Sequence, residues 1–210
     1  MHRKLEKEDL DRLMEAGVSE FAEKGLDKAN ISTIAKKAGL SVGVLYNYFD
    51  GKDDFFLHCV RHAVEPLGGM IEQIEFRPDD LEENMRLILQ TLFRYAREHN
   101  DYYVLYHEIT SGGCRKFAAQ LVEEVEAATA KGYMKMIEAG KGIGVVRQDM
   151  DIPLFAFFSD CLLMMIQFSM SCDYYKKRLE LYCGEEPSEE KLIQELMKFV
   201  SGAFGIREQR

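Results

Sequence analysis

The segment of residues 32–52, STIAKKAGLSVGVLYNYFDGK, constrains the fold more than any other part of the chain. Its first half predicts a short helix, because its apolar residues recur at intervals of three and four and so share one buried face. Ser32 is placed to cap this helix. Gly39 is placed to end it, because glycine adopts the positive φ of a tight helix terminus without a steric penalty. The predicted buried positions are Ile31, Ile34, Ala35 and Ala38.

The second half of the segment predicts another short helix, which Ser41 is placed to cap. Leu45 and Phe49 are four residues apart and can pack inward together. Small residues at the end of the first helix would let the two helices cross closely, as a helix-turn-helix requires. The second helix would then leave four side chains near its exposed surface, where a recognition helix meets base edges and phosphates: Val42, Gly43, Tyr46 and Asn47.

Several polar side chains around this motif suit contact with a nucleic acid. Tyr46 and Tyr48 carry hydroxyls that could donate to phosphate oxygens, and Lys52 follows the second helix closely. Lys36 and Lys37 fall on the solvent side of the first helix. The alternative is a tight helix pair in an all-α core that binds no nucleic acid.

The run IAKKAGLSVGVLYNYFDGKDDFF resembles the DNA-binding domain of the TetR (tetracycline-repressor-like) transcriptional regulators. The resemblance covers about residues 8–66 and rests on positions that include Ala35, Gly39, Tyr46 and Phe49. Many members have lysine or glutamine where this chain has Val42, which can contact a thymine methyl group but cannot form a bidentate hydrogen bond. The resemblance implies DNA contacts at Ser32, Thr33, Ser41, Val42, Gly43, Tyr46, Asn47, Tyr48 and Lys52.

The rest of the chain predicts an all-α fold of about nine helices, with no convincing strand. We expect a three-helix helix-turn-helix DNA-binding domain over residues 1–52, although the family resemblance extends to about residue 66. A larger helical domain for effector binding and dimerisation is expected over residues 53–210. Within it, Pro66 is expected to kink or end a helix that starts near Asp53, and one long helix is expected from about Arg115 to Ala139.

The charge distribution argues against indiscriminate binding of nucleic acids. The chain has a formal net charge of −9, and residues 1–60 carry nine Lys or Arg against eleven Asp or Glu. Because phosphate contact requires local positive potential, the basic side chains must gather on one face, with Arg3, Lys4, Lys36, Lys37 and Lys52 as the contributors. Because residues 1–60 have no excess of positive charge, we expect one subunit to bind DNA with modest affinity. This expectation favours a dimer that binds two half-sites.

Residues 153–172 are mostly apolar and long enough to span a membrane. Asp160 near the middle argues against a span, because an acidic residue in hydrocarbon is costly. A helix that is apolar on most sides is better explained by burial from two directions, by its own core and by a second subunit. We therefore expect a homodimer through helices at about residues 152–182 and 188–204, in agreement with the TetR resemblance.

The middle helices carry aromatic and thioether side chains of the kind that line apolar pockets, although such residues are more often simple core. The TetR resemblance implies an effector cavity in this region. We expect an apolar or aromatic effector with one or two polar groups. The candidate pocket residues are Phe93, Tyr102, Tyr103, Tyr106, Tyr133, Phe155, Phe158 and Met165.

Other site classes find less support. His58 and His62 are four residues apart, a spacing that metal ligands can have, but no further ligand is indicated and no metal is expected. No catalytic constellation is recognisable, and neither an enzyme nor a cofactor is expected. The five cysteines form no CxxC pair and the N-terminus is highly charged, which is typical of a cytoplasmic protein.

Taken together, the sequence predicts a transcriptional regulator that binds double-stranded operator DNA. A homodimeric repressor relieved by a small molecule is the preferred form. The alternative is an all-α small-molecule-binding protein in which the helix-turn-helix is only structural.

Overall fold

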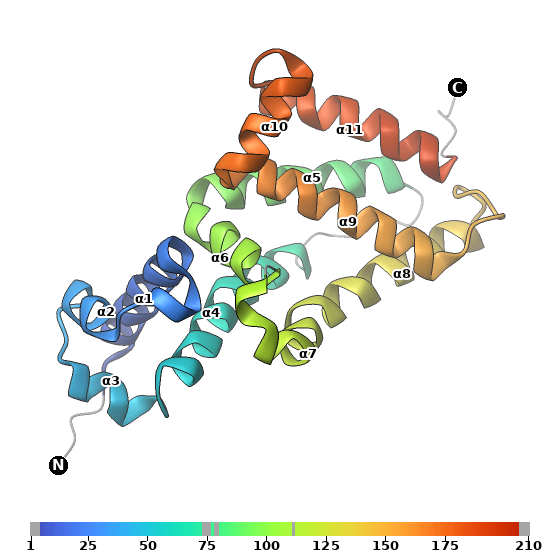
Figure 1. Ribbon diagram of the computed structural model, residues 1–210. Helices are drawn as coiled ribbons and strands as arrows, with labels where there is room; N and C mark the ends of the chain where they lie inside the picture. Colours follow the sequence, from blue (N-terminus) through green and yellow to red (C-terminus); the bar gives the residue numbers. More distant parts are fainter. Residues whose placement is uncertain (1–4, 73–76, 78–79, 111, 206–210) are drawn as a thin grey trace. The chain divides into compact units, whose positions relative to one another are not determined.

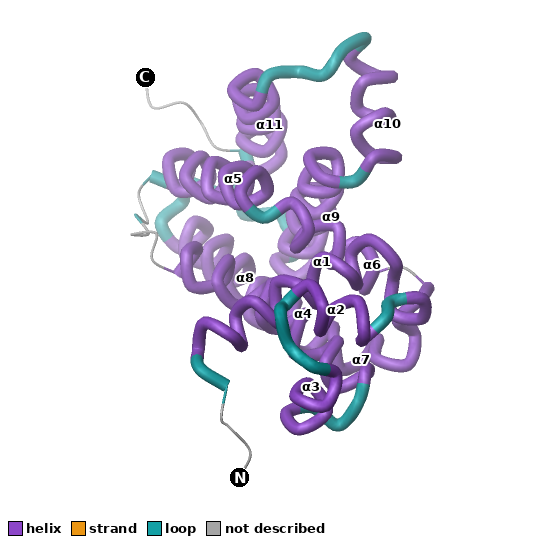
Figure 2. Tube along the Cα trace, turned by 90° about the vertical axis from the view of Figure 1, so that its left-hand side faces the viewer, coloured by secondary structure: helices purple, strands orange, loops and turns teal. Residues whose placement is uncertain are grey.

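The computed structural model describes residues 5–72, 77, 80–110 and 112–205. Within those ranges the chain consists of helices and loops, without a strand, which confirms the all-α prediction (Figure 2). Eleven α-helices are formed in the described part, compared with about nine expected. The chain divides into two compact units, residues 1–66 with 99–122 and residues 67–98 with 123–210. The predicted domain boundary at residue 52 stays a prediction.

The first unit contains the predicted helix-turn-helix, packed on a long first helix (Figure 1). Gly17 of that helix lies in a close contact, because a Cβ added there would stand 2.5 Å from Cys59 Sγ and 2.6 Å from Phe55 Cζ. Phe21 packs against Phe56 with ring centroids 5.1 Å apart. The helices are α1 (Lys7–Lys28), α2 (Ile31–Lys37), α3 (Val42–Tyr48), α4 (Lys52–Glu72), which continues into the second unit, α6 (Asn100–Thr110) and α7 (Ala118–Leu121).

One local expectation for this unit is wrong, and a second is wrong in part. Asn30, not Ser32, caps α2, since the Asn30 side chain accepts hydrogen bonds from the amides of Ser32 and Thr33. The α4 helix continues to Glu72 with Pro66 inside it, so Pro66 does not end the helix, and a kink at Pro66 stays a prediction. Asn and Ser are equally good N-caps. Because Asn30 and Ser32 are only two residues apart, the sequence alone did not distinguish which of them caps the helix.

The second unit is built from helices that share one core (Figure 1). The α9 helix packs against both α5 and α8, and α11 packs against α5. Its fully or nearly fully buried side chains include Leu89, Ile137, Ala156 and Phe204. The helices are α5 (Leu81–Glu98), α8 (Ala127–Gly142), α9 (Ile152–Ser171), α10 (Asp173–Cys183) and α11 (Glu189–Phe204).

The helix expected over residues 152–182 is two helices, because the backbone of Cys172 is extended (φ −105°, ψ 127°) between α9 and α10. The helix expected over residues 115–139 is also interrupted. It consists of the 3-10 turn Gly112–Phe117, α7, the π-helical turn Val122–Glu126, and α8, which extends through Gly140 to Gly142. These breaks explain why more helices form than expected.

Candidate functional site

The turn between α2 and α3 has the geometry that the sequence predicted. Gly39 has a φ of 71°, and the amide of Leu40 donates to the carbonyl of Ala35 over 2.9 Å, which is a Schellman helix end. Ile34, Ala35, Ala38 and Leu45 are buried, so the two short helices pack inward as expected.

The α3 helix begins at Ser41, whose hydroxyl accepts a hydrogen bond from the amide of Val44 over 3.3 Å, which confirms the predicted cap. Tyr46 is the most exposed aromatic side chain of α3, with 53% of its surface accessible. Thr33, Val42 and Lys52 are half-buried. The other predicted contact residues are exposed on this side of the motif or beside it: Ser32, Lys36, Lys37, Ser41, Gly43, Asn47 and Tyr48.

Gly43 leaves the start of α3 open. A Cβ added at Gly43 would meet only the Ser41 hydroxyl, at an ordinary contact distance of 3.9 Å. The fold therefore has no steric need for glycine at this position. A missing side chain beside a helix N-terminus allows a phosphate or base edge to approach the backbone closely.

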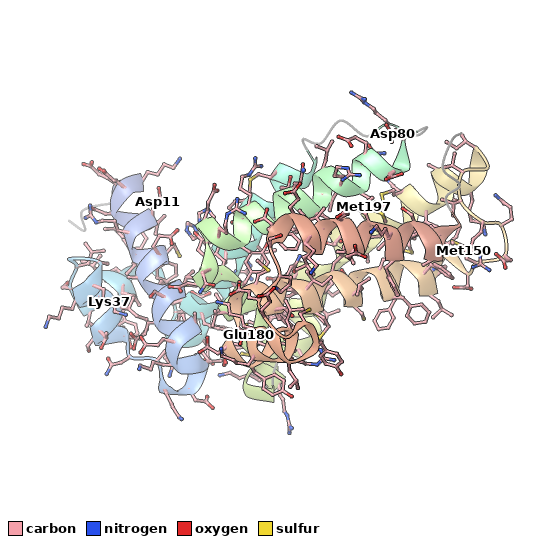
Figure 3. The ribbon with its side chains drawn as sticks, turned by 90° about the horizontal axis from the view of Figure 1, so that it is seen from above. Asp11, Lys37, Asp80, Met150, Glu180 and Met197 are labelled. Atoms are coloured by element: carbon pink, nitrogen blue, oxygen red, sulfur yellow. The ribbon has the colours of Figure 1, made fainter. Side chains whose placement is uncertain are left out.

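The three lysines of the motif differ in their surroundings. The Lys37 ammonium, labelled in Figure 3, lies 3.2 Å from a carboxylate oxygen of the buried Glu20, which also accepts a hydrogen bond from the amide of Asn30. The Lys52 ammonium donates to the carbonyl of Asp27 over 2.9 Å and to that of Ala29 over 3.4 Å. Lys36 is exposed and makes no ion pair with the residues that the structure describes.

These contacts give the lysines separate roles. Lys37 links α2 to α1 although its side chain stays exposed, and Lys52 links the start of α4 to the end of α1. Lys36 is exposed without such a link in the described chain, and DNA contacts by all three lysines stay predictions. Tyr48 also has a structural contact, because its hydroxyl accepts a hydrogen bond from the amide of Leu5, ahead of α1. Arg3 and Lys4, expected to add positive charge, lie outside the described residues.

A small pocket lies between α5 and α9 in the second unit. Its volume of about 10 Å³ is near the minimum that admits one water molecule. From each helix four side chains line it at the spacing i, i+3, i+4, i+7, which marks one helix face. They are Leu89, Leu92, Phe93 and Ala96 on α5, and Leu163, Ile166, Gln167 and Met170 on α9.

Of the predicted pocket residues, Phe93 lines this pocket. Tyr102 and Tyr103 are buried in the first unit, where Tyr106 also belongs, and the Tyr102 hydroxyl donates to Glu15 of α1. Phe155 packs on Phe204, with ring centroids 5.9 Å apart. Burial raises the pKa of Tyr133, with smaller contributions from Asp160 and Glu126. The prediction missed the other seven lining residues. Their spacing of three and four residues along α5 and α9 was the sequence signal that could have identified them.

Residues in the described part of the chain leave the opposite face of α9 exposed. Phe157 and Phe158 have 60% and 57% of their surfaces accessible, and Leu154 is similarly exposed. Met165 falls on this face by its spacing from Leu154 and Phe158. By length and composition alone, α9 also meets the requirements of a membrane-spanning helix. Half-buried Asp160 lies within it, and burial raises the pKa of this carboxyl group.

The two weak metal candidates are engaged with acidic neighbours. His58 Nδ1 lies 2.9 Å from the carbonyl oxygen and 3.4 Å from a carboxylate oxygen of Asp54. His62 Nε2 lies 2.9 Å from a carboxylate oxygen of Glu15. Among the described residues, no group of three or more His, Cys, Asp or Glu side chains could hold a metal ion.

Comparison with known proteins agrees with this geometry. Residues 13–59 match the family of bacterial regulatory proteins, tetR family, and this range contains α2, the turn and α3. The chain is 23% identical over 157 residues to the HTH-type transcriptional repressor KstR2 of Rhodococcus jostii, covering 74% of this chain and 77% of the relative. It is 26% identical over 154 residues to the fatty acid metabolism regulator protein of Bacillus subtilis, covering 68% and 73% of the two chains.

Solved structures share the fold over nearly the whole chain. The fatty acid degradation regulator FadR from Bacillus halodurans superposes with a TM-score of 0.73 at 18% identity, and 99% of each chain is covered. The ketosteroid transcriptional regulator KstR2 of Mycobacterium tuberculosis superposes with a TM-score of 0.67 at 20% identity, covering 98% of each chain. The motif, the sequence relatives and the fold agree in supporting a transcriptional regulator of the tetR family, and residues 13–59 carry the segment that matches this family.

Proposed function

We propose that this DNA-binding repressor acts as a cytoplasmic homodimer on a two-fold operator and that a small apolar effector relieves repression. The observation that carries the proposal is the exposed face of α3, held by the Schellman turn at Gly39 and the cap at Ser41. Tyr46, Asn47 and Val42 of this face are the proposed contacts to base edges. Positioning contacts to phosphate come from Ser32, Thr33, Lys36, Ser41 and Tyr48.

Dimerisation is proposed through the uncovered face of α9 together with α11. Exposed Leu154, Phe157 and Phe158 make an apolar patch on α9, and α11 adds exposed Phe199. Large apolar side chains exposed together on one helix face mark a contact surface on a soluble protein. Two-fold pairing would present two copies of α3 to half-sites about 34 to 36 Å apart, which compensates for the weak positive charge of one subunit.

The effector is proposed to occupy the seam between α5 and α9. Seven of the eight side chains that line this pocket are apolar, which favours an apolar ligand. Two relatives are named as regulators of fatty acid metabolism and of ketosteroid-related transcription, which is consistent with a lipid-like effector class. Because the pocket has a volume of only about 10 Å³, binding of an effector would require α5 and α9 to separate.

Relief of repression would follow from differential binding. The α4 helix contains residues of both units, and its first residue, Lys52, is bonded to the end of α1. An effector that binds better when α4 has shifted would change the spacing of the two α3 helices. Operator affinity would then fall by the difference between the effector's binding free energies for the two states.

Selection of bound DNA from a random pool tests the proposal. We expect a two-fold sequence whose half-sites are about one helical turn apart, or a multiple of this distance. Sedimentation of the complex should give two chains per selected duplex. A selected sequence without two-fold symmetry, bound by one chain, would contradict the proposed assembly.

A further inference from the structure

The α10 helix has an apolar face that the described part of the chain does not cover. None of its eleven residues is buried there, and its contact with α9 includes Tyr175, which packs on Phe168 with ring centroids 5.5 Å apart. Tyr174, Leu181 and Tyr182 have from 74% to 82% of their surfaces accessible, and their spacing i, i+7, i+8 places them on one side of the helix, here called the α10 face. Because a helix this short is marginal without tertiary packing, we expect a partner on this face.

A second apolar surface lies near the opposite end of α9. Leu154, Phe157 and Phe158, here called the α9 patch, occupy the first two turns of α9, and α10 follows its last turn. With twenty residues, α9 is about 30 Å long. In Figure 3, Met150 marks the start of α9 and Glu180 marks α10 near the other end. Of the twelve large apolar or aromatic side chains that are exposed in the described chain, seven lie on α9, α10 and α11.

A two-fold axis can pair the two copies of α9 in antiparallel or in parallel orientation. An antiparallel pair brings the start of each α9 to the end of the other, and so brings the α9 patch of one subunit to the α10 face of its partner. A parallel pair brings the two copies of the α9 patch together instead.

The charges beside the two surfaces favour the antiparallel pair. Residues 147–160 carry one Arg against three Asp, a difference of −2, whereas residues 173–183 carry three Lys or Arg against two Asp or Glu, a difference of +1. Parallel pairing would place two copies of the acidic segment side by side, and like charges across an interface are unfavourable. Antiparallel pairing places each acidic segment beside the more basic α10.

We infer that α10 of each subunit covers the α9 patch of the other, so that the dimer has two reciprocal contacts in addition to the pairing of α9 and α11. This inference rests on the proposed function, because it takes the homodimer through α9 as its starting point. A stable interface buries about 800 Å² of each partner. The exposed large apolar side chains of α9 and α11 number four, and the α10 face adds three.

Combining opposite charges on the two surfaces tests the reciprocal contact, with sedimentation velocity of the full-length protein at physiological salt as the measurement. Phe158→Glu and Tyr182→Lys should each raise the dissociation constant of the dimer at least about tenfold, because each places a charge in an apolar contact. The chain that carries both changes should dimerise at least about fivefold more tightly than Phe158→Glu alone. Reciprocal contacts bring the new glutamate of one subunit within a Debye length, about 8 to 10 Å, of the new lysine of the other.

Phe158→Glu combined with Leu87→Lys is the matched control. Leu87 is an exposed apolar residue of α5, so this pair of changes has the same net charge but places the lysine outside the α10 face. It should dimerise as weakly as Phe158→Glu alone. Circular dichroism identifies folded variants, and Leu181→Lys replaces Tyr182→Lys if the latter is unfolded.

A wild-type dimer whose Tyr182→Lys variant is equally dimeric would overturn the inference and leave the proposed homodimer intact. The inference would also fail if the chain with both changes dimerised no more tightly than Phe158→Glu, because parallel pairing brings like charges together in that chain. A wild type that is monomeric at micromolar concentration would instead refute the homodimer of the proposed function, and the reciprocal contact with it.

Discussion

Individual residues of the helix-turn-helix separate into those that build the motif and those left to meet a partner. Lys37 and Lys52 have the same charge as Lys36, but their ammonium groups are bonded to Glu20 and to the last carbonyls of α1. Sequence spacing predicted that all three would be near DNA and could not distinguish them, because their different partners come from α1. Lys36 and Lys37 are both exposed, and Lys36 is the one of the two without an ion pair among the described residues.

Gly43→Ala should separate stability from DNA binding. Because a Cβ fits at Gly43 and alanine favours helix, the free energy of unfolding should rise by up to about 1 kcal/mol. Operator affinity should fall if DNA approaches the bare backbone at this point. Chemical denaturation and fluorescence anisotropy measure the two quantities. A more stable variant with unchanged operator affinity would remove Gly43 from the contact surface.

Lys52→Met should reduce the free energy of unfolding by about 1 to 2 kcal/mol, because it leaves the carbonyls of Asp27 and Ala29 without the ammonium donor. Lys36→Met is the matched control. It should leave stability within about 0.5 kcal/mol of the wild type, since Lys36 is exposed. Urea denaturation of both variants checks this, and equal stability of the two would show that the Lys52 contacts contribute nothing.

At the scale of helices, the sequence predicted those features that short-range sterics determine. The Schellman turn at Gly39 and the cap at Ser41 were both predicted correctly. The break at Cys172 was missed because no glycine or proline marks it, although the neighbouring Ser171 and Asp173 are residue types that favour helix ends. The lining of the α5–α9 pocket was also missed, because it depends on which helices pack together, and the aromatic residues chosen instead are distributed over both units.

The cap of α2 gives a direct test of the corrected helix start. Asn30→Ala should lower the free energy of unfolding by about 1 kcal/mol, because two amides of the first turn lose their acceptor. Ser32→Ala should change it by less than about 0.5 kcal/mol, because the exposed Ser32 is not the cap. Thermal denaturation of the two variants compares them. A larger loss for Ser32→Ala would restore the sequence-based assignment.

At the scale of the whole molecule, the uncovered face of α9 is the feature that a single chain does not explain. Burying a side chain such as Phe158 is worth about 1.5 to 3 kcal/mol, so several together favour association strongly. The apolar sequence of α9 predicted burial on two sides. Within the chain, the side toward α5 is covered, and the opposite side is left for the proposed second subunit.

If α9 forms the proposed dimer contact, Phe158→Glu should give monomers at micromolar concentration where the wild type is dimeric, with unchanged helical content. Lys135→Glu, an exposed change on α8, controls for the added negative charge and should leave the dimer intact. Sedimentation velocity distinguishes the species. A dimeric Phe158→Glu variant would remove this part of α9 from the subunit contact.

The exposed face of α3 is proposed to contact the bases of operator DNA, and anisotropy titration of Tyr46→Ala against the selected operator measures this contact. Tyr46 is largely exposed, so the variant should keep its stability within about 0.5 kcal/mol of the wild type. We predict that its operator affinity falls at least about tenfold at fixed salt, as expected for one lost specific contact. Undiminished affinity in a folded, dimeric Tyr46→Ala protein would contradict the account.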